Sequence, residues 1–250
     1  MQYKVTAVYF SPTGGTKKAV QMLAAAFDNA VLTDNTLPRQ REQKIEFAAD
    51  ELLIAASPVY AGQLPQVQGL WSNLHGNGTP CVLLACYGNR HYDDTLAQLQ
   101  RLLEKQGFKV IGAAAVVIPH IFSEKLGQNR PDAEDQKILR NFAEKIKHKL
   151  QSGQWAELSL PGHPEPLIKE PIPVPKTFAE EKCTMCGTCA ALCPTGAIDA
   201  VTMDCDAKLC ISCMRCVRYC RTGARTFNAG KISAWLEANF QQPRAVECFS

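Results

Sequence analysis

The chain has 250 residues, a mass of 27.5 kDa and a formal net charge of +3, with 46% hydrophobic and 20% charged residues. This composition is that of a folded globular protein, and the length suffices for one medium and one small domain. The small charge, without interleaved basic and aromatic residues, excludes a typical nucleic-acid binder. No apolar run reaches membrane-spanning length, and no signal-peptide pattern follows Met1. We expect a cytoplasmic protein without a membrane span, whose thiols stay reduced.

Residues 1–151 alternate apolar strand patterns with helical patterns. We expect strands at 5–10, 52–56, 81–86 and 110–118, and helices at 17–27, 94–106 and 131–150. Because continuous apolar strands separated by helices are typical of a parallel sheet covered on both faces, the pattern predicts a doubly wound α/β fold. Cys81 and Cys86 lie an odd number of positions apart in one strand, so we expect them on opposite faces and assign them no joint site.

The first expected strand is followed directly by Ser11-Pro-Thr-Gly-Gly-Thr16 and then by a helix. Doubly wound sheets bind ligands outside the carboxyl ends of their strands, and N–H groups at a helix N-terminus hold phosphates. The hydroxyls of Ser11, Thr13 and Thr16 suit such a site, and Gly14 and Gly15 allow a tight turn. Because Ser, Thr and Gly also form ordinary turns, the position between strand and helix carries the prediction of a phosphate loop.

Two cysteine runs of the same form occupy the last part of the chain. They read Cys183-x2-Cys186-x2-Cys189-x3-Cys193 and Cys210-x2-Cys213-x2-Cys216-x3-Cys220. A thiolate at every third position, with a fourth after a wider gap, lets a short loop hold three corners of an iron-sulfur cube, so two runs predict two 4Fe-4S clusters. A zinc site or a disulfide framework accounts less well for two runs of four. No motif surrounds Cys205 or Cys248, and we assign them no role.

The two runs also share the residues after their last cysteine, Cys193-Pro-Thr-Gly-Ala and Cys220-Arg-Thr-Gly-Ala. Together they resemble the bacterial ferredoxin domain, a small α+β domain with two 4Fe-4S clusters. In that family the fourth cysteine of each run binds the cluster of the other run. The resemblance therefore implies one cluster on Cys183, Cys186, Cys189 and Cys220, and the other on Cys210, Cys213, Cys216 and Cys193.

The loop at residues 11–16 resembles the FMN-phosphate loop of flavodoxins, whose pattern is Ser/Thr-x-Thr-Gly-x-Thr. This resemblance implies a flavodoxin-like doubly wound sheet with strand order 2-1-3-4-5, and FMN as the cofactor. It also implies that the loops after the next two buried strands hold the isoalloxazine ring. The candidate ring-binding residues are Ser57, Pro58, Val59, Tyr60, Gly62, Tyr87, Gly88, Asn89 and Tyr92.

Within these two loops, Tyr60 and Tyr92 are the candidates for stacking on the flavin ring, and Asn89 and Gly62 for contacts at its polar edge. The alternative for each tyrosine is a half-exposed loop residue without a role. Neither loop has the Gly-x-Gly-Asp pattern of ordinary flavodoxins. The whole chain, including its Tyr-Gly-Asn-Arg loop, resembles the flavodoxin-ferredoxin fusion proteins of anaerobic prokaryotes.

The chain is thus expected to have three parts. Residues 1–151 form the flavodoxin-like FMN-binding domain, and the proline-rich residues 152–177 form a stiff linker. Residues 178–250 form the ferredoxin domain, which ends with an amphipathic helix at 231–240.

Four arginines recur around the second cysteine run, at positions 215, 218, 221 and 225. We interpret them as solvent-facing charges that offset the negative charge of thiolate-bound clusters. The alternative is a docking patch for an acidic redox partner.

The cofactors together predict electron transfer, because a 4Fe-4S cluster passes single electrons whereas FMN accepts one or two. No Gly-x-Gly-x-x-Gly motif supports direct reduction by a nicotinamide. We therefore expect a carrier that passes low-potential electrons between two clusters, FMN and an external redox partner protein. The alternative is an FMN-dependent reductase of a small acceptor fed by its own clusters, with His91 and Tyr92 as weak catalytic candidates. A third interpretation is a subunit of a larger redox complex.

Overall fold

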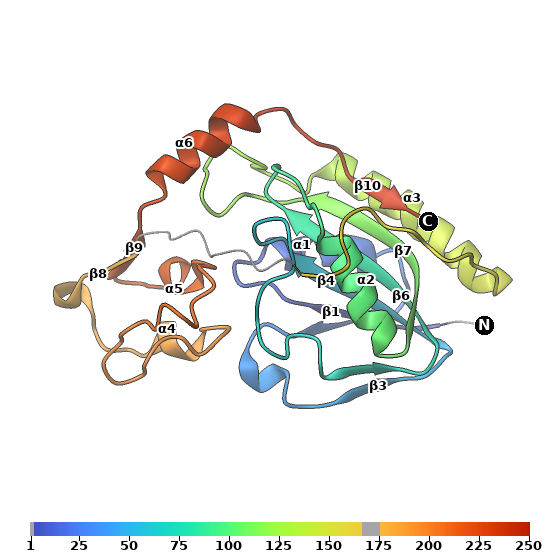
Figure 1. Ribbon diagram of the computed structural model, residues 1–250, viewed down its shortest axis with the longest axis horizontal. Helices are drawn as coiled ribbons and strands as arrows, with labels where there is room; N and C mark the ends of the chain where they lie inside the picture. Colours follow the sequence, from blue (N-terminus) through green and yellow to red (C-terminus); the bar gives the residue numbers. More distant parts are fainter. Residues whose placement is uncertain (1–2, 167–175) are drawn as a thin grey trace.

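The computed structural model describes residues 3–166 and 176–250. Its centre is a six-stranded sheet in the order β10-β7-β6-β4-β1-β2 (Figure 1). The strands are β1 (Lys4–Tyr9), β2 (Val31–Asp34), β4 (Glu51–Pro58), β6 (Thr79–Tyr87), β7 (Phe108–Val117) and β10 (Glu247–Phe249). All neighbours pair in parallel except β10, which is antiparallel to β7. Counted in chain order, the five parallel strands have the expected order 2-1-3-4-5, which confirms the flavodoxin-like fold.

The sheet is covered on both faces, as its apolar strands require. Strand β6 is buried along its whole length. Helices α1 (Gly15–Ala24) and α3 (Ala133–Ser152) pack on one face, and α2 (Thr95–Lys105) packs on the other. Cys86 lies in the first of these cores and Cys81 in the second, so the prediction of opposite faces is confirmed. A small parallel pair, β3 (Ile45–Phe47) and β5 (Leu74–Gly76), lies outside the main sheet.

The cysteine-containing part is a small α+β unit. Strands β8 (Lys176–Phe178) and β9 (Arg225–Phe227) pair antiparallel, and the 3₁₀ helix η2 (Glu180–Lys182) precedes the first cysteine. One short helix follows the second cysteine of each run, α4 (Thr188–Ala191) and α5 (Arg215–Arg218). The residue before each helix has left-handed backbone, with φ 70° at Gly187 and φ 59° at Met214. The internal repeat in sequence is thus a repeat in conformation.

The end of the chain returns to the first part, which the sequence did not predict. The amphipathic helix α6 (Gly230–Asn239) leads away from the cysteine-containing part, and β10 then joins the main sheet (Figure 1). Cys248 of β10 faces Ala114 of β7 in the ladder. In α6, Leu236 is buried but Trp235 is 53% exposed, so the apolar side of the expected helix is only partly covered.

The returning segment is held by side chains of the loop after β6. Asn89 Nδ2 donates to the carbonyls of Phe240 at 2.7 Å and Gln242 at 2.9 Å, and its Oδ1 accepts from the Arg244 N–H. The Tyr92 hydroxyl donates to Glu247 Oε2 at 2.7 Å. These bonds join the middle of the chain to its last residues.

The expected linker lies partly outside the described residues, since only 152–166 and 176–177 belong to the described ranges. Its described first part runs along α2, where Gln100 Nε2 donates to the Leu158 carbonyl at 2.7 Å. The His163 N–H donates to Asp94 Oδ1 at 3.0 Å. Among the described residues, no helix combines the length and apolar character needed to cross a membrane.

The Tyr92 hydroxyl provides a test of how the last strand is held. Tyr92→Phe keeps the buried ring but removes the donor to Glu247, a loss of about 1 kcal/mol. We expect amide hydrogen exchange at residues 247–249 to become about fivefold faster. The control is Tyr219→Phe, because the Tyr219 side chain is 41% exposed. Equal exchange in the two variants would contradict this role of Tyr92.

Candidate functional site

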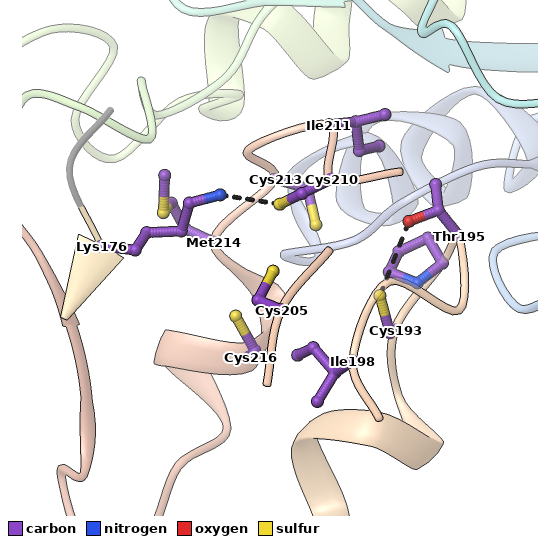
Figure 2. Close-up of a pocket in the computed structure, with 11 residues that line it drawn as sticks. Lys176, Cys193, Thr195, Ile198, Cys205, Cys210, Ile211, Cys213, Met214 and Cys216 are labelled. Carbon is purple, nitrogen blue, oxygen red and sulfur yellow. Dashed lines mark hydrogen bonds between the residues drawn. The ribbon is translucent and has the colours of Figure 1, made fainter. Parts of the chain in front are cut away.

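The first three cysteines of the second run and the last cysteine of the first run line one cavity. It lies between Cys193, after α4, and the segment leading into α5 (Figure 2). The cavity is lined by Lys176, Cys193, Pro194, Thr195, Ile198, Cys205, Cys210, Ile211, Cys213, Met214 and Cys216. All four cysteines that the ferredoxin resemblance assigns to one cluster are therefore brought together. This set includes Cys193 from the other run, and the four thiols fit the ligand set of a 4Fe-4S cluster.

Lys176 supplies positive charge at this cavity. Its Nζ donates to Cys210 Sγ at 2.7 Å and to Ser212 Oγ at 3.3 Å. Burial raises the pKa of the Cys210 thiol, but Lys176, together with the Ser212 N–H and the Cys205 thiol, outweighs this effect and the net pKa is lowered. Burial without such a partner raises the pKa of the Cys213 thiol to about 12. Sequence reasoning missed Lys176, which it placed at the end of the linker.

The other four cysteines lie nearer the surface. Cys186 is exposed, while Cys183, Cys189 and Cys220 are half-buried. The Met185 N–H donates to Cys183 Sγ at 3.4 Å, the kind of backbone bond that stabilises a thiolate. Among the described residues no three His, Cys, Asp or Glu side chains converge on a single metal ion.

Arg225 lies between the two cysteine sets. It is 7% exposed, donates to the Met203 carbonyl, and stacks over the Phe178 ring at 4.8 Å. Burial lowers the pKa of Arg225, but the hydrogen bond to Cys189 and the charges of Cys189 and Cys216 have a larger effect in the opposite direction. The net pKa of Arg225 is therefore raised. The expectation of a solvent-facing Arg225 was wrong, because α5 ends at Arg218 and Arg225 begins β9.

The loop at residues 11–16 has free donors at the start of α1. Within the described ranges, the N–H groups of residues 13–16 donate to no protein acceptor. Gly14 has φ 94° with open space where a side chain would lie, and Thr13 is half-buried beside it. Ser11 Oγ caps the helix by accepting from the Lys17 N–H at 2.9 Å. This arrangement fits a phosphate group.

The two predicted ring loops are joined to each other. The Asp94 N–H donates to the Gly62 carbonyl at 2.8 Å, and a Cβ at Gly62 would lie 2.1 Å from Asp93 Oδ2. Gly62 therefore permits a close approach of the loops, with φ 83°. Ser57 and Pro58 are buried at the end of β4, whereas Val59 is half-buried. Gly88 is similarly covered, because a Cβ there would lie 2.3 Å from the His120 ring.

The aromatic candidates differ in position. Tyr60 is half-buried, and burial, with the nearby Cys213 and Cys210 thiolates, raises the pKa of its hydroxyl well above the usual value. Tyr92 is 2% exposed, with its ring stacked on His91 and edge-on to Tyr87. The ring of Tyr92 and the side chain of Asn89 are thus occupied by other protein groups. Of the two stacking candidates, Tyr60 is the less buried.

Direct contacts join the phosphate loop to the cysteine-containing part. Arg215 Nη1 donates to the Pro12 carbonyl at 2.6 Å, and its buried Nε has no partner among the described residues. Arg41 Nη2 donates to the Pro194 carbonyl at 2.8 Å. Of the four arginines, Arg218 and Arg221 are exposed, as expected, while Arg215 lies in this contact. Sequence spacing offered no signal for Arg41.

Comparisons with known proteins agree with the cysteine pattern. Residues 177–199, which contain the first run, match the 4Fe-4S binding domain family. No curated protein matches the chain.

Several solved structures are similar to the chain. A flavodoxin from the domain Archaea is 12% identical, with a TM-score of 0.41 over 59% of this chain and 99% of its own. A Streptococcus pneumoniae TIGR4 flavodoxin is 17% identical, with a TM-score of 0.40 over 58% and 98%. The Flv1 flavodiiron core from Synechocystis sp. PCC6803 is 13% identical, with a TM-score of 0.43 over 61% of this chain and 37% of its own.

His120, behind the Gly88 loop, gives the protein a defined pH dependence. Burial and the charge of Arg90 lower its pKa to about 4, and its Nδ1 accepts from the Phe122 N–H. An unfolded histidine has a pKa of about 6.5, so the unfolded chain binds more protons between these values. We therefore expect the thermal unfolding temperature to fall as pH decreases from about 6.5 to 4.

The substitution His120→Asn should make this fall less steep, because the group that gains a proton on unfolding is gone. The control is His148→Asn, since His148 is exposed on α3. A slope that is the same in both variants would show that His120 is not the responsible group.

Proposed function

We propose that this chain, which joins a flavodoxin-like fold to a ferredoxin-type 4Fe-4S segment, is an electron carrier. It passes low-potential electrons between two 4Fe-4S clusters, FMN and an external redox partner protein. The observation that carries the proposal is the contact between the cysteine-containing part and the phosphate loop, in which Arg215 Nη1 donates to the Pro12 carbonyl at 2.6 Å. When bound, the clusters exchange single electrons and FMN exchanges one or two.

The assigned cluster ligands follow the two spatial sets. Cys210, Cys213, Cys216 and Cys193 hold the cluster near the flavin loops. Cys183, Cys186, Cys189 and Cys220 hold the other one, near the surface. The cavity that Cys193, Cys210, Cys213 and Cys216 share supports this assignment, as do the positive charges of Lys176 and Arg225 beside the cysteines.

The flavin is assigned to the loops at the carboxyl ends of β1, β4 and β6. The N–H groups of residues 13–16 bind its phosphate, and the positive charge of Arg215 beside Pro12 favours that anion. Tyr60 stacks on its ring, supported by its half-buried position next to Cys213. Because Tyr92 and Asn89 are occupied, residues 87–89 contribute backbone contacts only.

The external partner is assigned to the surface around the other cluster, whose ligands are Cys183, Cys186, Cys189 and Cys220. Cys186 is exposed, and exposed Arg218 and Arg221 lie on and just after α5, which packs beside α4. A positive surface beside an exposed cluster favours a partner with acidic side chains. Electrons then reach the flavin through the second cluster.

An FMN-dependent reductase of a small acceptor is the second candidate. The Arg90 and His91 side chains are each 36% exposed in the presumed ring loop. Asp93 orients both side chains: its carboxylate forms an ion pair with Arg90, and its N–H donates to His91 Nδ1 at 2.9 Å. This places a cation and an imidazole where a small anionic acceptor would meet the flavin. Turnover of such an acceptor that falls in His91→Asn, with unchanged cluster-to-flavin transfer, would favour this candidate.

The phosphate loop is tested by the double variant Thr13→Ala, Thr16→Ala. Loss of both hydroxyls beside the free N–H groups should reduce FMN content by at least about tenfold and leave cluster absorbance intact. Bound flavin is measured after acid release. The matched control is Thr202→Ala in an exposed turn. Stoichiometric FMN in the double variant would remove the loop assignment.

The contact between the two parts is tested by Arg215→Gln against Arg218→Gln on the same helix. Loss of the Arg215 contact removes about 1.4 kcal/mol, so electron transfer from cluster to flavin should slow by up to about tenfold. Flash reduction followed by flavin absorbance measures this rate. Arg218→Gln should leave this internal rate unchanged and slow only the reaction with the partner. Equal internal rates in both variants would contradict the proposed route.

A further inference from the structure

The cavity at the second cysteine run holds one thiol more than a cluster needs. Cys205 lines it together with Cys193, Cys210, Cys213 and Cys216. Figure 2 shows the five side chains arranged around a common space, with Cys205 between Cys216 and Cys210. A 4Fe-4S cluster has four iron corners, and each takes one thiolate. One of the five thiols is therefore without a corner.

A structured hairpin holds Cys205 at the cavity. Cys205 forms an antiparallel bridge with Ile198, and the Asp206 N–H donates to the Ala197 carbonyl at 2.8 Å. The turn between them is closed by Asp199, whose Oδ1 accepts from the N–H groups of residues 201 and 202. This geometry keeps the thiol at the cavity wall. The other cysteines outside the two runs belong to the main sheet, Cys81 and Cys86 in β6 and Cys248 in β10.

Among the four assigned ligands, both Cys210 and Cys216 interact with Cys205, and Cys210 does so more strongly. Cys205 lines the same cavity as Cys210 and interacts with it electrostatically, and the positive charge of Lys176 acts on both thiols. Lys176 Nζ lies 2.7 Å from Cys210 Sγ. A positive charge shared by two adjacent sulfurs stabilises a thiolate at either one.

We propose that Cys205 is a reserve ligand of the second cluster, able to replace Cys210 at its iron. In the exchange the iron-sulfur bond to Cys210 breaks and one to Cys205 forms. The thiol proton of Cys205 passes to Cys210, and the iron keeps its oxidation state. The inference rests on the second cluster of the proposed function. It gives that cluster a way to survive damage to one of its ligands.

The test is the iron and acid-labile sulfide content of the anaerobically purified full-length protein. Wild type should hold about eight iron atoms, and so should Cys205→Ala and Cys210→Ala. The double variant Cys205→Ala, Cys210→Ala should hold about four. The matched control is Cys186→Ala, which has no additional cysteine beside it and should hold about four. Alanine is used because a serine hydroxyl is itself able to bind iron.

A second measurement identifies the ligand directly. In loaded wild type, iodoacetamide should label the exposed Cys205 thiol, detected by mass spectrometry. In loaded Cys210→Ala, this label should be lost because Cys205 binds iron. The EPR signal of the reduced second cluster should also differ between the two proteins.

The outcomes separate this inference from the proposed function. About four iron atoms in wild type would overturn the two-cluster assignment itself. About eight in wild type with about four in Cys210→Ala would keep both clusters and overturn the reserve role. A loss of iron in Cys205→Ala alone would also overturn it, since Cys205 would then be a resident ligand. Labelling of Cys205 by iodoacetamide in loaded Cys210→Ala would also overturn the reserve role.

Discussion

The pairing of β10 with β7 is the contact on which the arrangement of the two parts depends. The cysteine-containing part leaves the sheet domain after α3 and returns to it at residues 247–249, so both of its ends are attached to one scaffold. A single linker allows many orientations, whereas a second attachment removes most of them. The contact of Arg215 with Pro12 therefore forms at a smaller entropic cost, as an intramolecular bond between parts already held close together.

The negative charge of cysteine thiolates accounts for the positions of two cations in the cysteine-containing part. A buried cation is costly unless a partner charge lies beside it, and Arg225 is buried between Cys189 and Cys216. Lys176 is placed similarly against Cys210. Charge and hydrogen bonds at the ligand sulfurs are among the factors that set a cluster's reduction potential. The modest net charge of the chain thus includes cations whose partners are inside the molecule.

Local sequence patterns predicted the sheet well, because burial on both faces leaves a continuous apolar run such as residues 52–56. The cysteine spacing was equally informative, since cluster ligation demands a fixed local geometry. Contacts between distant segments left no such pattern. Nothing near Tyr92 or Asn89 indicates that the last residues of the chain cover them. Cys205 has no motif, and only its bridge to Ile198 brings it to the cavity.

The position of β10 also determines how the chain is divided. It pairs with the backbone of Ala113–Ala115, at what is otherwise the open edge of an apolar strand. Unpaired edges of this kind are templates for aggregation. A fragment that stops before the cysteine runs would expose this part of the edge. In topological terms the cysteine-containing part is an insertion, because it lies in the chain between α3 and β10, the last strand of the main sheet.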